Sequence, residues 1–336
     1  MKAPSLSASS SGRALFWLAL LLVVVLGASL FFGRYPSLAF LSPERLASDE
    51  LAQRLVWNLR LPRLLTALLL GMTLAAAGEV FQMLFGNPLI EPGFLGVSQG
   101  AAFGAAFSII FLGNSAWLVQ SCAALFAFLG LGGSYLLARR VRFGGWVLRL
   151  VLAGIAVSAL FSAGLGVLKY LADPLSQLPE ITFWLLGGLY SITWAQLKSI
   201  LLVTLLGLYV MYRMRWRLNL LSLEDETAFS LGLAPGRERA LLLFAATAAT
   251  AAVISVSGMV GWVGLIIPHI ARRLFGADAR LALPASMLVG GIFTILCDDL
   301  SRTLLAGEIP LGIFTSLVGA AFFILLMVTQ NIKVQR

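Results

Sequence analysis

Residues 14–32 read ALFWLALLLVVVLGASLFF, nineteen consecutive positions without a charged side chain. A helix needs about 20 predominantly apolar residues to cross a hydrocarbon core roughly 30 Å thick. The stretch follows the basic Lys2 and Arg13, as an export signal would. It is longer than the apolar part of such a signal, and no small-residue cleavage site follows it. We therefore expect residues 14–33 to form a retained first transmembrane helix.

Comparable apolar stretches recur along the whole chain. Of the 336 residues 60% are hydrophobic and 12% are charged, whereas soluble domains contain about 25% charged residues. The sequence predicts an all-α fold, a polytopic membrane protein with about ten transmembrane helices. All belong to one transmembrane domain over residues 1–336, with the core helices in 62–329. The helices are expected near residues 14–33, 62–84, 94–112, 116–138, 148–171, 193–212, 238–257, 260–275, 282–303 and 310–329.

The net charge of +9 has a topological explanation. The basic residues lie in short clusters between apolar stretches rather than on one continuous face, so nucleic acid is not expected as a partner. With ten crossings, sixteen of the 24 basic residues, including Lys2, Lys333 and Arg336, fall on the side of both termini. The excess of Lys and Arg on cytoplasmic segments predicts that both termini are cytoplasmic.

Three connections are longer than a turn. Residues 34–61 and 172–192 are expected outside, the second with a short helix that ends at Phe183 and Trp184, and the charged segment 214–237 is expected inside. Loops of this size in a compact membrane protein often carry function.

The sequence lacks the residue patterns that several kinds of chemistry need. The dipeptide Gly-Lys does not occur, so there is no GxxxxGK[ST] phosphate loop, and ATP hydrolysis would need another subunit. His269 is the only histidine, and Cys122 and Cys297 lie in separate apolar stretches, so neither a metal site nor a cofactor is expected. No Ser, His and carboxylate set suggests a hydrolase, and we expect no enzyme activity.

A set of motifs and single residues follows one order along the chain: RLPR (60–63), Gly71, Gly78, Gln82, NPL (87–89), EPGFLGVSQGA (91–101), LAGI (152–155), FWLLG (183–187), LSLEDETA (221–228), LG (231–232), GWVGLIIPHIAR (261–272), Asp298, Arg302 and EIPLG (308–312). In this order they resemble the FecCD family of binding-protein-dependent permeases, which import iron-siderophores, heme and cobalamin. The last helix departs from the family's Gly-x-Pro-x-Phe pattern, because Ala321 stands at the proline position.

The resemblance implies the architecture of a type II ABC importer permease in the bacterial inner membrane, surrounded by lipid. Two copies, a homodimer, would enclose a central path for a metal chelate such as an iron-siderophore, heme or cobalamin. Two ATP-binding subunits would bind from the cytoplasm, and a periplasmic binding protein would deliver the cargo. The inner end of the path would narrow within residues 141–150, where the sequence singles out no gating residue.

The family's outer docking arginines correspond to Arg60, Arg63 and Arg302, which would bind glutamates of the binding protein. The planar guanidinium suits this role because it can bind a carboxylate through two parallel hydrogen bonds. Snorkelling of these side chains to the membrane interface is the alternative.

The segment 214–237 resembles the family's coupling segment, which sits in a groove of the ATPase. The apolar contacts would come from Leu221, Leu223, Ala228 and Leu231. The acidic triplet of Glu224, Asp225 and Glu226 would add charge, and Gly232 would end a short helix. A solvated amphipathic turn is the alternative.

Glu79 stands where the family has a small apolar residue. An ionisable group inside a membrane span is costly and suggests either a path-lining role or a buried partner. Gln82 lies three residues further on the same helix face and is within reach of a hydrogen bond. Glu79 and Gln82 are therefore candidates for the translocation path, with structural pairing as the alternative.

A different functional class remains open, in which the protein is a proton-coupled secondary transporter. Its proton relay would use the few carboxylates of the helices and their ends, namely Glu79, Asp298, Asp299 and Glu308. Such groups are scarce in the other helices, which argues against this class.

Overall fold

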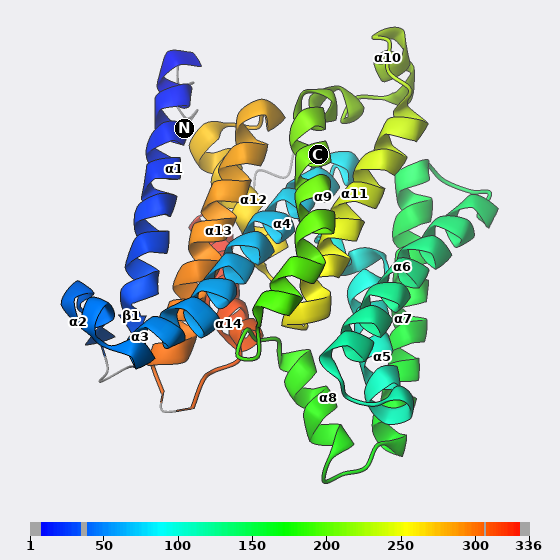
Figure 1. Ribbon diagram of the computed structural model, residues 1–336. Coiled ribbons are helices and arrows are strands. Elements are labelled where there is room, and N and C mark those ends of the chain that lie inside the picture. Colours follow the sequence, from blue (N-terminus) through cyan, green and yellow to red (C-terminus); the bar gives the residue numbers. More distant parts are fainter. Residues whose placement is uncertain (1–7, 35–38, 306, 330–336) are drawn as a thin grey trace.

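The computed structural model describes residues 8–34, 39–305 and 307–329, which form a bundle built almost entirely of helices (Figure 1). The helices are α1 (Ala8–Phe31), α2 (Pro43–Ser48), α3 (Glu50–Leu55), α4 (Leu61–Phe85), α5 (Val97–Phe107), α6 (Ala116–Arg140), α7 (Trp146–Leu171), α8 (Gln177–Leu186), α9 (Trp194–Leu221), α10 (Asp225–Ser230), α11 (Pro235–Ser257), α12 (Val263–Phe275), α13 (Ala279–Thr303) and α14 (Leu311–Thr329).

Short elements complete the described chain. A 3-10 turn (η2, Pro92–Leu95) precedes α5, and π-helical turns precede α4 (η1, Val56–Arg60) and follow α5 (η3, Ser108–Leu112). The strands β1 (Phe32–Gly33) and β2 (Ala39–Phe40) pair antiparallel. Seven of the described helices are long and apolar enough to cross a membrane, and two further apolar helices are shorter. The predicted all-α, polytopic fold class is confirmed.

Each of the ten predicted segments corresponds to a helix, and the largest difference is at α9. The sequence predicts 193–212, because Arg213 and other charges follow, but α9 continues to Leu221. The extension buries Met214, Leu218 and Leu221, which continue from Met211 at spacings of three and four residues and keep one apolar face on the bundle. The first eight residues of the segment 214–237 are therefore part of α9 rather than a connection.

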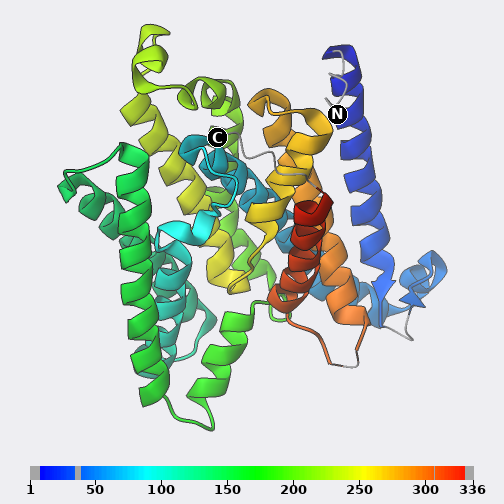
Figure 2. The same ribbon diagram turned by 180° about the vertical axis from the view of Figure 1, so that it is seen from behind.

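The bundle has two distinct ends (Figure 1). The start of α1 and α10 lie at one end, which we call the α10 end, whereas α2, α3 and α8 lie at the opposite α8 end. Seen from behind, α14 stands against α12 and α13 (Figure 2). Lys2, Lys333 and Arg336 lie outside the described residues, so the cytoplasmic location of both termini stays a prediction.

Helix α4 is the centre of the packing, with α9, α11, α12 and α13 against it. A Cβ atom at Gly71 would overlap the carbonyl oxygen of Gly290 on α13, and a Cβ at Gly78 would overlap the carbonyl of Gly264 on α12. Thr294 of α13 donates a hydrogen bond to the carbonyl of Ala67 at 2.7 Å. Without a hydrophobic drive between helices in lipid, such close backbone approach holds them together.

Helices α5 and α12 are short, with 11 and 13 residues. At a rise of about 1.5 Å per residue, neither spans a hydrocarbon core of roughly 30 Å. Irregular backbone precedes both, and the residue before α12, Trp262, has φ of 72°. A bulky residue in this left-handed region is an outlier that marks a constrained site.

Glu79 lies on α4 with no exposed side-chain surface. Its Oε2 accepts hydrogen bonds from the guanidinium of Arg272 on α12 at 2.9 Å and from the hydroxyl of Ser286 on α13 at 3.3 Å. The same guanidinium donates to Oε1 of Gln82, and the amide nitrogen of Gln82 donates to the carbonyl of Gly264 at 3.2 Å. These contacts tie α4, α12 and α13 together inside the chain.

The geometry favours the pairing alternative for Glu79. Its counter-ion is Arg272, which belongs to the GWVGLIIPHIAR motif but which the sequence did not identify as a partner. Gln82 does not pair with Glu79 directly, and both side chains bind the same guanidinium. The role of the two residues in lining a path stays a prediction.

Removing one partner of this ion pair should destabilise the helix bundle. Glu79→Met leaves the Arg272 charge without its counter-ion, and breaking a buried pair in this way costs about 3–5 kcal/mol. We expect Glu79→Met and Arg272→Met each to lower the midpoint of thermal unfolding in detergent. The double variant, which removes both charges, should recover part of the loss. If the unfolding midpoint of the double variant falls by the sum of the two single decreases, the residues do not act as a pair.

Candidate functional sites at the two ends and in the bundle

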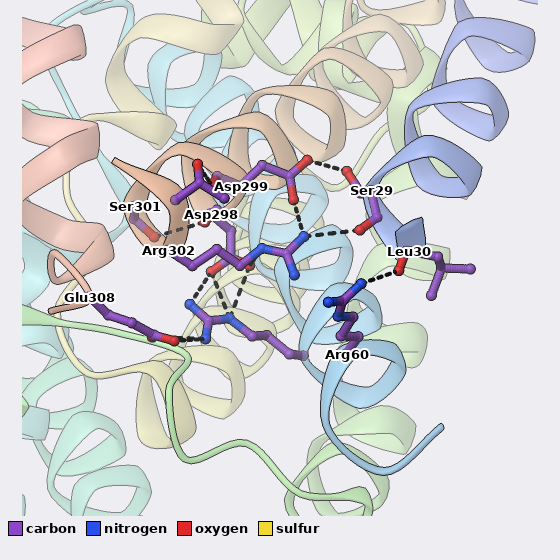
Figure 3. A network of polar contacts seen from close by, with 10 residues as sticks. Ser29, Leu30, Arg60, Asp298, Asp299, Ser301, Arg302 and Glu308 are labelled. Atoms are coloured by element: carbon purple, nitrogen blue, oxygen red, sulfur yellow. Dashed lines mark hydrogen bonds and ion pairs between the residues drawn. The ribbon is translucent and has the colours of Figure 1, made fainter. Parts of the chain in front are cut away.

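The three arginines expected to contact a binding protein lie around one cavity, and two of them, Arg60 and Arg302, are labelled in Figure 3. Arg60 ends η1, Arg63 lies in the first turn of α4, and Arg302 lies in the last turn of α13. Since α4 and α13 pack against each other in opposite directions, the start of one meets the end of the other. We call the connected set the arginine network, which comprises Ser29, Leu30, Arg60, Arg63, Asp298, Asp299, Arg302 and Glu308.

Arg63 binds two carboxylates at once. Its Nε lies 3.0 Å from both oxygens of Asp298, and a second nitrogen lies 2.9 Å from Asp298 Oδ1. Its remaining nitrogen lies 2.8 and 3.0 Å from the oxygens of Glu308 in the α13–α14 connection. Asp298 is 2% exposed and Glu308 is 44% exposed. The inner edge of the guanidinium is therefore held by a buried carboxylate, and the outer edge by an accessible one.

Arg302 and Arg60 join α1 to this network. Arg302 forms an ion pair with Asp299 and donates to the carbonyl of Ser29 at 3.0 Å, and the hydroxyl of Ser29 donates to Asp299. Arg60 donates to the carbonyl of Leu30 at 3.0 Å. Among the residues that the structure describes, no carboxylate lies within ion-pair distance of Arg60.

A cavity of about 440 Å³ opens onto these arginines. Four guanidinium groups line it, those of Arg34, Arg60, Arg63 and Arg302, but Glu308 is the one carboxylate among its described lining residues. Asp298 and Asp299 are buried beneath it. The accessible wall is thus strongly cationic although the whole network is close to neutral, and it suits an acidic group.

The coupling residues lie at the α10 end, and their exposure changes the expected contact set. Leu223 and Leu231 are exposed, as are the side chains of the acidic triplet, whereas Leu221 and Ala228 are fully buried within the chain. Phe229, which the sequence analysis did not select, is 72% exposed. The accessible apolar surface of α10 and its flanks is therefore formed by Leu223, Phe229 and Leu231, and Leu221 and Ala228 anchor the segment to the bundle.

The sequence did not reveal a cavity of about 830 Å³ where η2, α8 and α14 surround the start of α12. Its wall is apolar except for Glu91 and Ser316, and it includes Trp262 and Leu317. The Glu91 carboxylate accepts a hydrogen bond from the backbone of Trp262. Two of the matching motifs contribute to this wall, the EPG triplet at 91–93 and the GWVG motif at 261–264, but neither predicted a cavity.

Comparisons with known proteins agree on one family. The FecCD transport family matches residues 15–329. The molybdate import system permease protein MolB of Haemophilus influenzae is 37% identical over 318 residues, which cover 93% of this chain and 94% of MolB. The hemin transport system permease protein HmuU of Yersinia pestis is 36% identical over 94% of this chain and 95% of its own length.

A solved structure has the same architecture. An inward-facing ABC transporter of the metal-chelate type superposes with a TM-score of 0.88 at 38% identity, over 95% of this chain and all of the matched chain. Together with the family match over nearly the whole length, this likeness confirms the predicted fold of an ABC importer permease. The chain belongs to the FecCD transport family.

Proposed function

We propose that this chain is the permease subunit of an ABC importer for a metal chelate or a related metal-containing anion. The family match over residues 15–329 carries the proposal. Two copies would form a homodimer in the bacterial inner membrane with both termini cytoplasmic. Two ATP-binding subunits would attach at the α10 end, and a periplasmic binding protein would dock at the α8 end. The cargo class includes iron-siderophores, heme and cobalamin, and MolB adds molybdate to the candidates.

The cavity around Glu91 is a better candidate for the translocation path than Glu79. Glu79 is enclosed by three helices and paired with Arg272. The cavity is open, is lined by the backbone segments that precede α5 and α12, and lies beside the partly exposed helix α14. A second copy against α8 and α14 would close it into a central passage.

The proton-coupled alternative finds no support in the described carboxylates. Glu79, Asp298, Asp299 and Glu308 would form its relay, and each of them is in an ion pair with an arginine. These ion pairs account for the four carboxylates as structural contacts within the chain, so their presence does not call for a proton relay. Reconstitution tests the proposal directly, because uptake should require the ATPase and ATP, and should persist when the proton gradient is dissipated.

Reversing the charge of Arg60 should weaken binding-protein docking. Arg60 lacks a carboxylate partner among the described residues, so it is the arginine most ready to accept one from outside. We expect Arg60→Glu to lower the affinity of the cognate binding protein for the nanodisc-embedded transporter several-fold, mainly through a slower association rate. Arg54→Glu is the matched control, because Arg54 lies on the same segment with 71% exposure and outside the cavity. Equal effects of the two variants would exclude a specific docking role.

Removing Glu308 should have the opposite effect. Glu308 occupies the outer edge of Arg63, where a carboxylate of the binding protein would bind, so the two carboxylates compete. Glu308→Gln should raise the affinity by a few-fold, since an accessible ion pair is worth only about 0–1 kcal/mol. Glu50→Gln removes the same charge from the exposed Glu50–Arg54 pair and controls for the change in net charge. A loss of affinity with Glu308→Gln would show that Glu308 supports docking instead of competing.

Phe229 should carry much of the attachment to the ATPase. It is the most exposed apolar residue of α10, and truncating an aromatic anchor in an interface commonly costs about 2 kcal/mol or more. We expect Phe229→Ala to reduce ATPase copurification without reducing the membrane yield. Thr227→Ala, on the same short helix, should leave both unchanged. Ala228→Glu should lower the yield itself, because Ala228 is buried within the chain. Normal copurification with Phe229→Ala would exclude Phe229 from the contact.

A further inference from the structure

Arg239 joins the coupling segment to the rest of the bundle. It lies near the start of α11 and is 8% exposed. One terminal nitrogen forms an ion pair with Asp225 in the first turn of α10. The other donates to the carbonyl of Leu221, the last residue of α9, at 2.9 Å. A single guanidinium therefore holds the end of α9 and the start of α10 together.

The same guanidinium reaches a third element. Its carbon lies 5.8 Å from the ring centroid of Trp146, the first residue of α7, within the range of a cation–π interaction. Trp146 directly follows the α6–α7 connection, within the 141–150 region where the path is expected to narrow. Arg239 therefore contacts the coupling segment on one side and this region on the other.

A stack of aromatic rings continues from Trp146 to α4. Trp146 stacks on Phe85 with centroids 5.9 Å apart, and Phe85 stacks on Phe81 at 5.8 Å. Phe85 is the last residue of α4. The chain then leads through residues 86–88 to Leu89 and Glu91, which line the cavity of about 830 Å³. Side-chain contacts thus run from α10 to Phe85, and the backbone of residues 86–91 joins Phe85 to the wall of that cavity.

We propose that Arg239 is the positioning residue that carries a displacement of α10 to Trp146 and, through Phe85, to the cavity wall at Leu89 and Glu91. The inference rests on the proposed function, in which an ATPase moves α10. Coupling between distant sites needs contiguous packed contacts that can take two arrangements. The links at Arg239 and Trp146 suit this, because α10 is short and Asp225 is 66% exposed, whereas Phe81 is anchored in the core.

The role requires arginine rather than any cation. The planar fork binds Asp225 and the Leu221 carbonyl with separate nitrogens while its carbon lies over the ring of Trp146. A lysine ammonium is a compact charge without a planar face, so it can replace the ion pair but not all three contacts at once. Arg239→Lys therefore separates charge from geometry.

The test follows movement at the α6–α7 connection and needs no cargo. A nitroxide is placed on Arg142→Cys, an exposed position, in both copies of the reconstituted transporter, with Cys122 and Cys297 replaced by alanine. The distance between the two labels is measured by pulsed electron resonance before and after trapping with ATP and vanadate. We expect Arg239→Lys and Trp146→Leu each to lose at least half of the distance change, and Trp146→Phe to retain most of it.

Arg280→Lys is the matched control, because Arg280 lies at the same end with 58% side-chain exposure and no contact to this chain of residues. Its distance change should equal that of the unmodified transporter. Trp146→Leu leaves the bonds of Arg239 to α9 and α10 in place, so it carries the test if Arg239→Lys fails to accumulate. A full distance change with Trp146→Leu, or loss of ATPase capture by it, overturns the proposal. Failure of the unmodified chain to capture an ATPase would instead overturn the proposed function, and this inference with it.

Discussion

Charge in a low-dielectric bundle must be neutralised by a close partner, and the architecture of this chain follows from that constraint. The buried carboxylates of the described helices, Glu79, Asp298 and Asp299, are each paired with an arginine from another element or another turn. Glu79 on α4 meets Arg272 on α12, and Asp298 on α13 meets Arg63 on α4. Because an unpaired charge would be far more costly than the pair, these contacts fix which helices are neighbours and at what height. Close packing at Gly71 and Gly78 then brings the same helices near enough for the side chains to reach.

The sequence predicted the helices well because hydropathy in a bilayer is a strong, local signal. The limits of α6, α7 and α13 lie within a few residues of the expected ones. The predicted end of α9 was wrong, because the arginines on its outward face suggested a loop. Met214 and Leu218 continue the buried face of the helix there. Side-chain partners were harder to predict, since Arg272 lies 193 residues from Glu79 and no local pattern connects them.

For the candidate sites too, the sequence predicted the segments but not the contacts of their side chains. The motifs selected three arginines and the segment 214–237, and the structure places Arg60, Arg63 and Arg302 around one cavity. Local sequence could not tell which side of a short helix faces outward, so it selected the buried Ala228 and passed over the exposed Phe229. It also could not show that Arg63 is already bound to two carboxylates. The docking and coupling roles themselves stay predictions.

The irregular starts of the short helices α5 and α12 have a consequence for what fills the cavity around Glu91. Each begins with irregular backbone, and at membrane depth such backbone is tolerated only where protein or water satisfies its polar groups. The backbone of Trp262 finds a partner in Glu91, but the segment around Gly261 lines an open cavity. Lipid tails could not satisfy the amides and carbonyls exposed there. Water therefore has to fill this cavity, and a passage built on it, as proposed above, would need its barrier to ion leakage at its ends rather than in a dry interior.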